Sequence, residues 1–342
     1  MTGSERVKAA MRYQPVDKVP LQYMYTPVGF YEHGEKLNDL FQQLPGDFAP
    51  FTRQPIPILT VSDFDEAGRY HSFSRDEWGT LWEYRIFGIA GIPAEYPIAD
   101  AAAMDSYIPP TLPLQTQVDK TQAKLEMATH QKQYYGSYYV GSLFERLRQL
   151  RPDNDVFADM ALGEHGIEVL TDRIAGHVSK MVARAIDCGA DAIAFSDDYG
   201  MEGSMIISPS LWRSFFGTRL KTIFAPAVAA GLDIIVHSCG QITPILQDLR
   251  EMGATAIWPQ LPAYDMGDLA AHCRALGLAV AVHTDRANVM TYGTAQDVRD
   301  LVKREFEVFR MMDGGAWFYA EVDNGFPFEN IEALIETIAL WR

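Results

Sequence analysis

The feature that most constrains the fold is a repeated pattern of short apolar runs that end in polar residues. From about residue 135 onward these runs alternate with amphipathic stretches such as 172–190 and 294–312. Such alternation is typical of βα units around a parallel sheet, whose buried strands are almost continuously apolar. Six strands are predicted: YYVGS (138–142), AIAFSD (192–197), IIVHS (234–238), AIWPQ (256–260), AVAVHT (279–284) and WFYAEV (317–322).

Two earlier apolar runs, VPLQYMY (19–25) and ILTVSDF (58–64), bring the number of predicted strands to eight. That number predicts an α/β fold of the (β/α)₈ or TIM-barrel type. The stretch DEWGTLWEYRIFGIAGIPAEYPI (76–98) predicts an aromatic hairpin. We therefore expect one barrel domain over residues 1–342, with residues 65–130 as an insertion over the barrel mouth.

Composition excludes several classes of function. The 342 residues carry a formal net charge of −16, which disfavours binding to nucleic acid or to an anionic membrane surface. No apolar run reaches the roughly 18 residues that span a bilayer, and the start MTGSERVKAAMRY lacks the core of a signal peptide, so we expect a cytosolic protein. The three cysteines, Cys188, Cys239 and Cys273, are too few and too widely spaced for a disulfide framework.

Polar residues at the ends of the predicted strands mark a candidate site. In a (β/α)₈ barrel the active site lies at the carboxyl ends of the strands. The residues that follow this rule are Asp197, Asp198, Tyr199, Glu202, His237, Cys239, Gln260, His283, Glu321 and Asp323. Each also has a purely structural interpretation, because carboxylates cap helices and a barrel histidine can be satisfied by a neighbouring group.

His237 and Cys239 stand two residues apart, and strand side chains two apart point to the same side. An imidazole nitrogen and a thiolate are ligands that suit zinc, whose catalytic sites usually have three protein ligands. Asp323 or Glu321 is the expected third ligand by position, with Glu202 and Asp198 more remote. The alternative is that His237 only donates a hydrogen bond and Cys239 only packs.

Four segments resemble the uroporphyrinogen decarboxylase superfamily: SDDYGMEGSMIISPSLWRSFF (196–216), VHSCGQITPILQDLREMGATAI (236–257), HTDRANVMTYGTAQDVRDLVKREFEVF (283–309) and DGGAWFYAEVDNGFPFENIEAL (313–334). Three others are similar to its corrinoid-dependent methyltransferase branch: SERVKAAMRYQPVDKVP (4–20), DEWGTLWEYR (76–85) and GSLFERLRQLR (141–151). The decarboxylases of this superfamily begin with an arginine-rich segment that grips the substrate. The corresponding stretch VPLQYMYTPVGFYEHG (19–34) contains no arginine, so porphyrinogen decarboxylation is not expected.

The resemblance also implies a metal. Thiol-methylating members of the branch hold zinc with a His-x-Cys pair and a second cysteine near the end of the last strand. Here Asp323 stands where that cysteine is expected. A carboxylate is a harder ligand than a thiolate, which favours zinc as a Lewis acid on an oxygen substrate, or no metal at all.

The function implied is transfer of a methyl group from a small methylated substrate, first of all an aromatic methyl ether, to the cobalamin cobalt of a corrinoid carrier protein. Asp197, Asp198, His237 or the zinc would protonate or polarise the leaving oxygen, with Glu145 as a further candidate. The aromatic residues expected around the substrate are Tyr23, Tyr25, Trp82 and Trp258. The alternatives are a zinc-dependent methyl-corrinoid:thiol methyltransferase, a decarboxylase-like enzyme, or a non-catalytic carrier-binding protein. Barrels of this superfamily are often homodimers.

Overall fold

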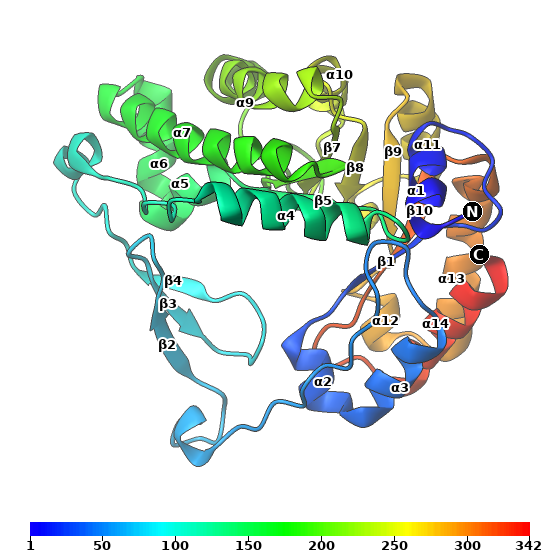
Figure 1. The fold of residues 1–342 in the computed structure, drawn as a ribbon. Coiled ribbons are helices and arrows are strands. Elements are labelled where there is room, and N and C mark those ends of the chain that lie inside the picture. Colours follow the sequence, from blue (N-terminus) through cyan, green and yellow to red (C-terminus); the bar gives the residue numbers. More distant parts are fainter.

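Seven parallel strands form the central sheet of the protein, and the computed structural model describes residues 1–342 (Figure 1). The strands lie in the order β1-β10-β9-β8-β7-β6-β5. They are β1 (Leu21–Met24), β5 (Ser137–Gly141), β6 (Ala192–Ser196), β7 (Asp233–Ser238), β8 (Ala256–Pro259), β9 (Ala279–His283) and β10 (Ala316–Glu321). The sheet curls like a TIM barrel, which confirms the predicted α/β barrel architecture.

The predicted strand at 58–64 does not form. This stretch holds only a short 3₁₀ turn, Val61–Asp63, and Ile58 and Val61 are almost fully exposed at 88% and 92%. Pro55 and Pro57 come just before it, and proline cannot donate a hydrogen bond to a strand ladder. The sheet therefore has seven strands in place of the predicted eight, with β1 and β5 as its edges.

Asp47 bridges these two edges at the amino-terminal end of the barrel. Its main-chain N–H donates to the carbonyl of Leu21 at 2.7 Å, and its own carbonyl accepts from the N–H of Tyr135 at 2.9 Å. Its carboxylate accepts from the N–H of Leu21 at 2.8 Å and pairs with the buried guanidinium groups of Arg6 and Arg342. The opening between β1 and β5 is thus closed at this end.

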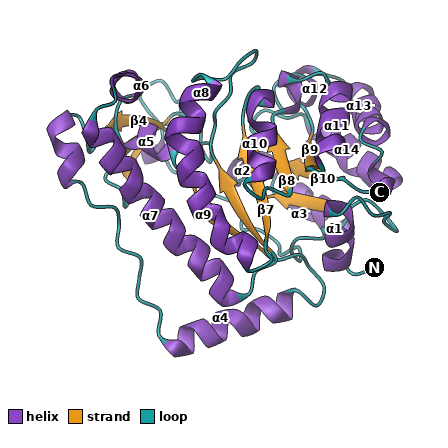
Figure 2. Ribbon diagram, turned by 90° about the horizontal axis from the view of Figure 1, so that it is seen from above, coloured by secondary structure: helices purple, strands orange, loops and turns teal.

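Helices surround the sheet (Figure 2). They are α1 (Gly3–Met11), α2 (Pro27–His33), α3 (Glu35–Gln43), α4 (Gln117–His130), α5 (Phe144–Leu150), α6 (Asp153–Leu162), α7 (His165–Cys188), α8 (Pro209–Trp212), α9 (Thr218–Ala229), α10 (Leu246–Glu251), α11 (Met266–Leu276), α12 (Val289–Tyr292), α13 (Ala295–Val308) and α14 (Phe328–Trp341). None of them is both long enough and apolar enough to span a bilayer.

Side chains alternate along each strand, which separates the core from the site. On β7, Ile234 and Val236 belong to the large apolar cluster shared with the helices. Ile235 belongs to a smaller cluster inside the barrel, and Trp258 of β8 packs against that cluster. Along β7, the inward-pointing side chains are therefore apolar inside the barrel, and the next inward position, at the carboxyl end of the strand, is His237.

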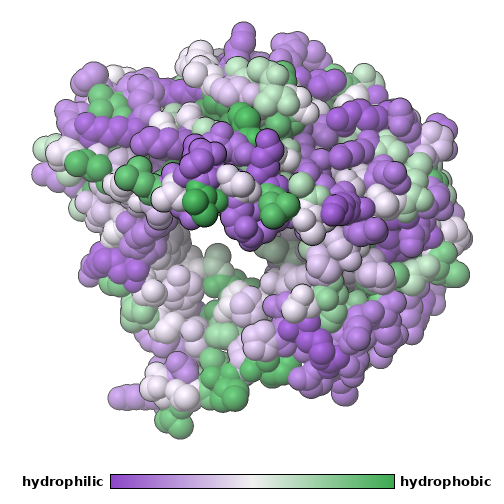
Figure 3. Space-filling model, in the orientation of Figure 1, coloured by the Kyte–Doolittle hydropathy of each residue, from purple (hydrophilic) through white to green (hydrophobic).

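A second, antiparallel sheet contains β2 (Ser72–Arg75), β3 (Leu81–Tyr84) and β4 (Ile92–Glu95), where an aromatic hairpin was predicted. It is tied to α5 because Thr80 Oγ1 donates to the carbonyl of Gln149 at 2.8 Å. The loop between β3 and β4 reaches α2, where the rings of Phe87 and Tyr31 are 5.5 Å apart, and the surface is deeply hollowed beside the small sheet (Figure 3). The role of residues 65–130 as a lid stays a prediction.

Candidate functional site

A cavity of about 1200 Å³ lies at the carboxyl ends of the parallel strands. Every strand of the main sheet contributes to its wall, through Met24 (β1), Tyr139 (β5), Ser196 (β6), His237 (β7), Trp258 (β8), His283 (β9) and Glu321 (β10). This is the end of the barrel where parallel α/β barrels place their active sites. We take it as the candidate active site.

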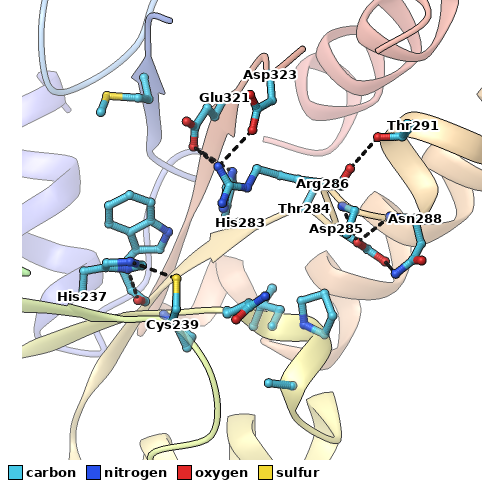
Figure 4. Close-up of a pocket in the computed structure, with 18 of the residues that line it drawn as sticks. His237, Cys239, His283, Thr284, Asp285, Arg286, Asn288, Thr291, Glu321 and Asp323 are labelled. Carbon is cyan, nitrogen blue, oxygen red and sulfur yellow. Dashed lines mark hydrogen bonds and ion pairs between the residues drawn. The ribbon is translucent and has the colours of Figure 1, made fainter. Parts of the chain in front are cut away.

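Two potential metal ligands, His237 and Cys239, lie on one wall at the end of β7 (Figure 4), and a third, Asp198, follows β6 beside them. The Nδ1 atom of His237 donates to the carbonyl of Trp258 at 2.8 Å, which leaves Nε2 to face the cavity. This Nε2 lies 3.5 Å from Cys239 Sγ and 3.4 Å from Asp198 Oδ1. Asp198 Oδ1 also accepts the N–H of Cys239 at 2.8 Å.

These three residues fit a zinc ion. Their ligand atoms all lie within 4.8 Å of one another. In a tetrahedral zinc site with bonds of about 2.0–2.3 Å, neighbouring ligand atoms are roughly 3.5 Å apart, close to the distances found here. The hydrogen bond from His237 Nδ1 to a carbonyl is the support that metal-bound histidines usually have. Asp198, His237 and Cys239 would hold the ion and leave a fourth position open.

This corrects the ligand set expected from the sequence. Asp323 and Glu321 were the expected third ligands, but neither belongs to the group formed by His237 and Cys239. Both carboxylates instead lie near Arg286, at 3.2 Å for Asp323 and 3.5 Å for Glu321. Asp198, expected to be more remote, takes their place.

Burial and charge set the protonation of this ligand set. Burial, together with the nearby Asp198 carboxylate, raises the pKa of the Cys239 thiol to about 12, so the thiol keeps its proton at neutral pH unless a cation displaces it. Burial also tends to raise the pKa of Asp198, but hydrogen bonding and charge from His237 hold it below its usual value. Asp198 is therefore ionised at neutral pH and is not an acid that could protonate a substrate.

Close packing of main chain fixes the two loops that carry the ligands. The N–H of Gly200 donates to the carbonyl of Cys239 at 3.1 Å, and the N–H of Gln241 donates to the carbonyl of Met201 at 2.7 Å. A Cβ on Gly240 would lie 2.1 Å from the carbonyl carbon of Gly200, and Gly240 has a φ of +68°. Glycine is required there because the loops touch backbone to backbone.

Asp197 does not face the cavity, which corrects the expected placement. It is fully buried, and its carboxylate accepts the main-chain N–H groups of Leu143, Phe144 and Glu145 at 2.7–3.0 Å. The hydroxyl of Tyr199, expected to bind substrate, donates to the same carboxylate at 2.6 Å. Burial raises the pKa of Asp197 to about 6 against the effect of these hydrogen bonds. Asp197 and Tyr199 therefore anchor the start of α5 to β6.

Glu145 lies beside this anchor and outside the cavity wall. Its side chain pairs with Arg148 at 2.9 Å. Burial raises its pKa to about 7, although Arg148 opposes the shift. The geometry therefore gives Glu145 no contact with the space that a substrate would occupy.

The opposite wall carries a second polar group, from β9, β10 and the loop after β9. His283 Nε2 lies 3.3 Å from Glu321 Oε2, and the guanidinium of Arg286 reaches both Glu321 and Asp323 (Figure 4). Burial lowers the pKa of His283 to about 3, so its ring is neutral. Asp285 does not pair with Arg286 but accepts the N–H groups of Ala287 and Asn288.

The remaining predicted residues divide between the wall and the core. Gln260 and Glu202 line the cavity, and the side-chain oxygen of Gln260 accepts the N–H of Gly240 at 2.9 Å. Among the four aromatic residues, only Trp258 is in the wall. Tyr23 and Tyr25 stack within a group of phenylalanines near α3, and Trp82 Nε1 donates to Asp76 at 3.0 Å.

Arg286 and Tyr139 are among the wall residues that the sequence did not predict. Arg286 is the only lysine or arginine there. It follows the predicted strand 279–284, so its position just past a strand end was the available signal. Tyr139 is 60% exposed and lines the cavity because β5 is an edge of the sheet. In the predicted eight-stranded barrel, β5 would have had a neighbour on both sides.

The fold and the position of the cavity define a parallel α/β barrel with its candidate site at the strand ends. The family profile of uroporphyrinogen decarboxylase (URO-D) matches residues 152–340, more than half of the chain. The chain therefore belongs to the uroporphyrinogen decarboxylase family. A search of curated proteins by sequence finds no significant match.

One solved structure shares this fold over the whole chain. A methyltransferase from Methanosarcina mazei superposes with a TM-score of 0.66 at 15% identity, and the match covers 99% of each chain. Dihydropteroate synthases from Xanthomonas albilineans and Anaplasma phagocytophilum each give a TM-score of 0.38 at 13% identity. Those two matches cover 60% of this chain and 69% and 75% of theirs.

Proposed function

We propose that this protein transfers a methyl group from the oxygen of a small methylated substrate, first of all an aromatic methyl ether, to the cobalt of a corrinoid protein. The observation that carries the proposal is the Asp198, His237 and Cys239 set at the edge of a large open cavity. The whole-chain likeness to a methyltransferase fold supports the same class of activity.

An ether methyl group is a poor electrophile because its leaving group is an alkoxide or phenoxide. The carbon–oxygen bond breaks with both electrons going to oxygen, while a cobalt(I) corrinoid supplies the electron pair for the new bond to carbon. The leaving oxygen must therefore be protonated or polarised. Asp197 is enclosed by its own hydrogen bonds and Asp198 is ionised, so neither supports the role of a general acid.

Polarisation at the ligand set is the better supported option. A zinc ion held there would act as a Lewis acid on the substrate oxygen. Asp198 contributes an oxygen ligand where a thiol-directed site would have a second thiolate, and hard ligands suit an oxygen substrate. His237 keeps its ring in place through the carbonyl of Trp258, so Nε2 stays aimed at the same point.

A thiol-directed methyltransferase is the second candidate, because Cys239 and His237 also suit a zinc that activates a thiolate. Decarboxylation of a porphyrinogen is less well supported. Its acidic substrate needs several cationic partners, whereas Arg286 is the only arginine or lysine of the wall and already pairs with Glu321 and Asp323. The partner we propose is a corrinoid carrier protein that covers the cavity, and the assembly we propose is a homodimer.

Two transfer assays test the function. In one, the protein is mixed with a cobalt(I) corrinoid and a panel of methoxyarenes, and methylcobalt formation is followed by its absorption spectrum. In the other, a methylated corrinoid is offered a thiol. We expect methylcobalt in the first assay and a rate at least about 100-fold lower in His237→Ala, because that change removes a ligand. Product in the thiol assay alone would favour the second candidate, and product in neither would reject both.

A further inference from the structure

Three polar atoms in the wall of the cavity are buried and have no hydrogen-bond partner. They are Trp258 Nε1, His283 Nε2 and Glu321 Oε2. Buried polar atoms are nearly always paired in folded proteins, because an unpaired one costs about 1–3 kcal/mol. Because all three residues line the cavity, a ligand that reaches these atoms after a small side-chain movement could supply the missing partners.

The three residues are neighbours. The rings of Trp258 and His283 are 5.9 Å apart and nearly perpendicular, and both contact Tyr319. His283 Nε2 lies 3.3 Å and the Arg286 guanidinium 3.5 Å from Glu321 Oε2, but neither contact has the geometry of a hydrogen bond. About nine-tenths of each of these two side chains is buried. Figure 4 shows His283 and Glu321 on a different wall from His237 and Cys239.

The chemistry of the three atoms limits what can pair with them. The indole N–H of Trp258 can only donate, and a carboxylate oxygen of Glu321 accepts. A hydroxyl group can accept from the first and donate to the second. A carboxylate ligand would be repelled by Glu321 and Asp323, whose charges Arg286 only partly offsets. An ammonium group would leave the indole N–H unpaired.

We propose that Trp258, His283 and Glu321 form a subsite that recognises a hydroxyl group on the substrate. The substrate class is then a small molecule with both a methylated oxygen and a free hydroxyl. The methylated part rests on the proposed function, whereas the hydroxyl part rests on the three unpaired atoms. The wall that carries His237 and Cys239 would take one end of the molecule and this subsite the other.

Binding of matched ligands tests the subsite without any methyl transfer. The three methoxyphenol isomers are compared by calorimetry with the three dimethoxybenzenes, in which the hydroxyl is masked by a methyl group. We expect at least one methoxyphenol to bind about tenfold or more tightly than its dimethoxy counterpart, because the masked hydroxyl can no longer donate to Glu321. Equal affinities within all three pairs would overturn the proposal.

Two variants assign the preference to the subsite. Glu321→Gln should reduce the ratio of the methoxyphenol affinity to the dimethoxybenzene affinity to about threefold or less. Because both affinities are measured on one preparation, their ratio does not depend on the amount of folded protein. Glu332→Gln is the matched control, because Glu332 is exposed on α14 and absent from the cavity wall, so it should keep the wild-type ratio. If Glu321→Gln does not fold, His283→Gln replaces it with the same expectation.

The outcomes separate this proposal from the proposed function. A wild-type protein that prefers a methoxyphenol but moves no methyl group would support the subsite and reject the transfer activity. A protein that demethylates methoxyphenols and dimethoxybenzenes and binds them with equal affinity would support the transfer activity and reject the subsite. A wild-type ratio retained in Glu321→Gln would overturn the subsite.

Discussion

Cys239 is the residue whose change most directly tests the metal. If Asp198, His237 and Cys239 hold zinc, we expect about one zinc per chain in the wild-type protein and a loss of most of it in Cys239→Ala, because the thiolate is the softest of the three ligands. Elemental analysis of the purified proteins measures this. Cys273→Ala is the control, since Cys273 is buried in α11 among apolar residues and should leave the zinc in place. Equal zinc contents in the two variants would show that Cys239 is not a zinc ligand.

Neighbouring carboxylates at 197 and 198 should respond differently to the same substitution. Asp197→Asn should lower the free energy of unfolding by about 2–4 kcal/mol, because the amide cannot accept from three N–H groups and a tyrosine hydroxyl. Asp198→Asn should cost about 1 kcal/mol or less, because an amide oxygen can still accept the N–H of Cys239.

Urea unfolding with a chelator present measures both variants free of any metal contribution. Asp198→Asn, but not Asp197→Asn, should then prevent zinc uptake by protein that is still folded. The reverse pattern would mean that Asp197 and not Asp198 is the ligand.

The difference between these two residues was accessible from the sequence. Alternation along the strand places Asp197 on the same face as Ile193 and Phe195, which are buried against the helices, and Asp198 on the face of Ser196. A pair of aspartates at a strand end therefore contributes one side chain to the site. By contrast, the pairing of Glu321 and Asp323 with Arg286 depends on how a loop turns back, and no local pattern encodes it.

At the scale of elements, α13 places a buried acid behind β9. Glu305 is 1% exposed, and its carboxyl accepts from Thr284 Oγ1 at 3.2 Å. Burial raises the pKa of Glu305 to about 8, although the hydrogen bond from Thr284 opposes the shift. The acid is therefore mostly protonated in the folded protein at neutral pH and ionised in the unfolded chain.

This shift predicts a pH dependence of stability. Between the unfolded pKa of about 4.3 and the folded pKa of about 8, unfolding releases a proton, so the free energy of unfolding falls as pH rises. The contribution of Glu305 is complete below about pH 4 and is lost by about pH 8. Urea unfolding at pH 5, 6, 7 and 8 should show a decline of up to about 1.4 kcal/mol per pH unit relative to Glu305→Gln. Parallel pH profiles for the two proteins would contradict this.

At the scale of the whole molecule, Asp47 joins parts of the chain that are far apart in sequence. It connects β1, the segment before β5, α1 and Arg342 at the amino-terminal end of the barrel. Asp47→Ala should lower the free energy of unfolding by about 3–5 kcal/mol, because it leaves two buried guanidinium groups without their shared partner. Asp17→Ala is the control: Asp17 also pairs with Arg6, but it is 43% exposed and should cost about 1 kcal/mol or less. Similar losses in the two variants would contradict a closing role for Asp47.

The barrel itself could be predicted because six of its strands are nearly continuous apolar runs between amphipathic helices. The failure of the eighth strand could not be predicted from its composition, because ILTVSDF resembles a strand. In the structure no partner buries this stretch, and two prolines precede it. The bridge that takes over part of its role is a single residue, Asp47. A contact made by one residue produces no repeating pattern in the sequence, so it could not be predicted.

The backbone contact between the loops after β6 and β7 bears on how such enzymes diversify. Gly200 and Gly240 meet through main-chain atoms, so most of the support for the ligand set does not depend on which side chain stands at 198. A lineage could therefore exchange Asp198 for cysteine, and so make the candidate ligand set richer in sulfur, by one amino-acid substitution that leaves the barrel intact. The glycines, which touch no ligand, are the positions such a lineage would have to keep.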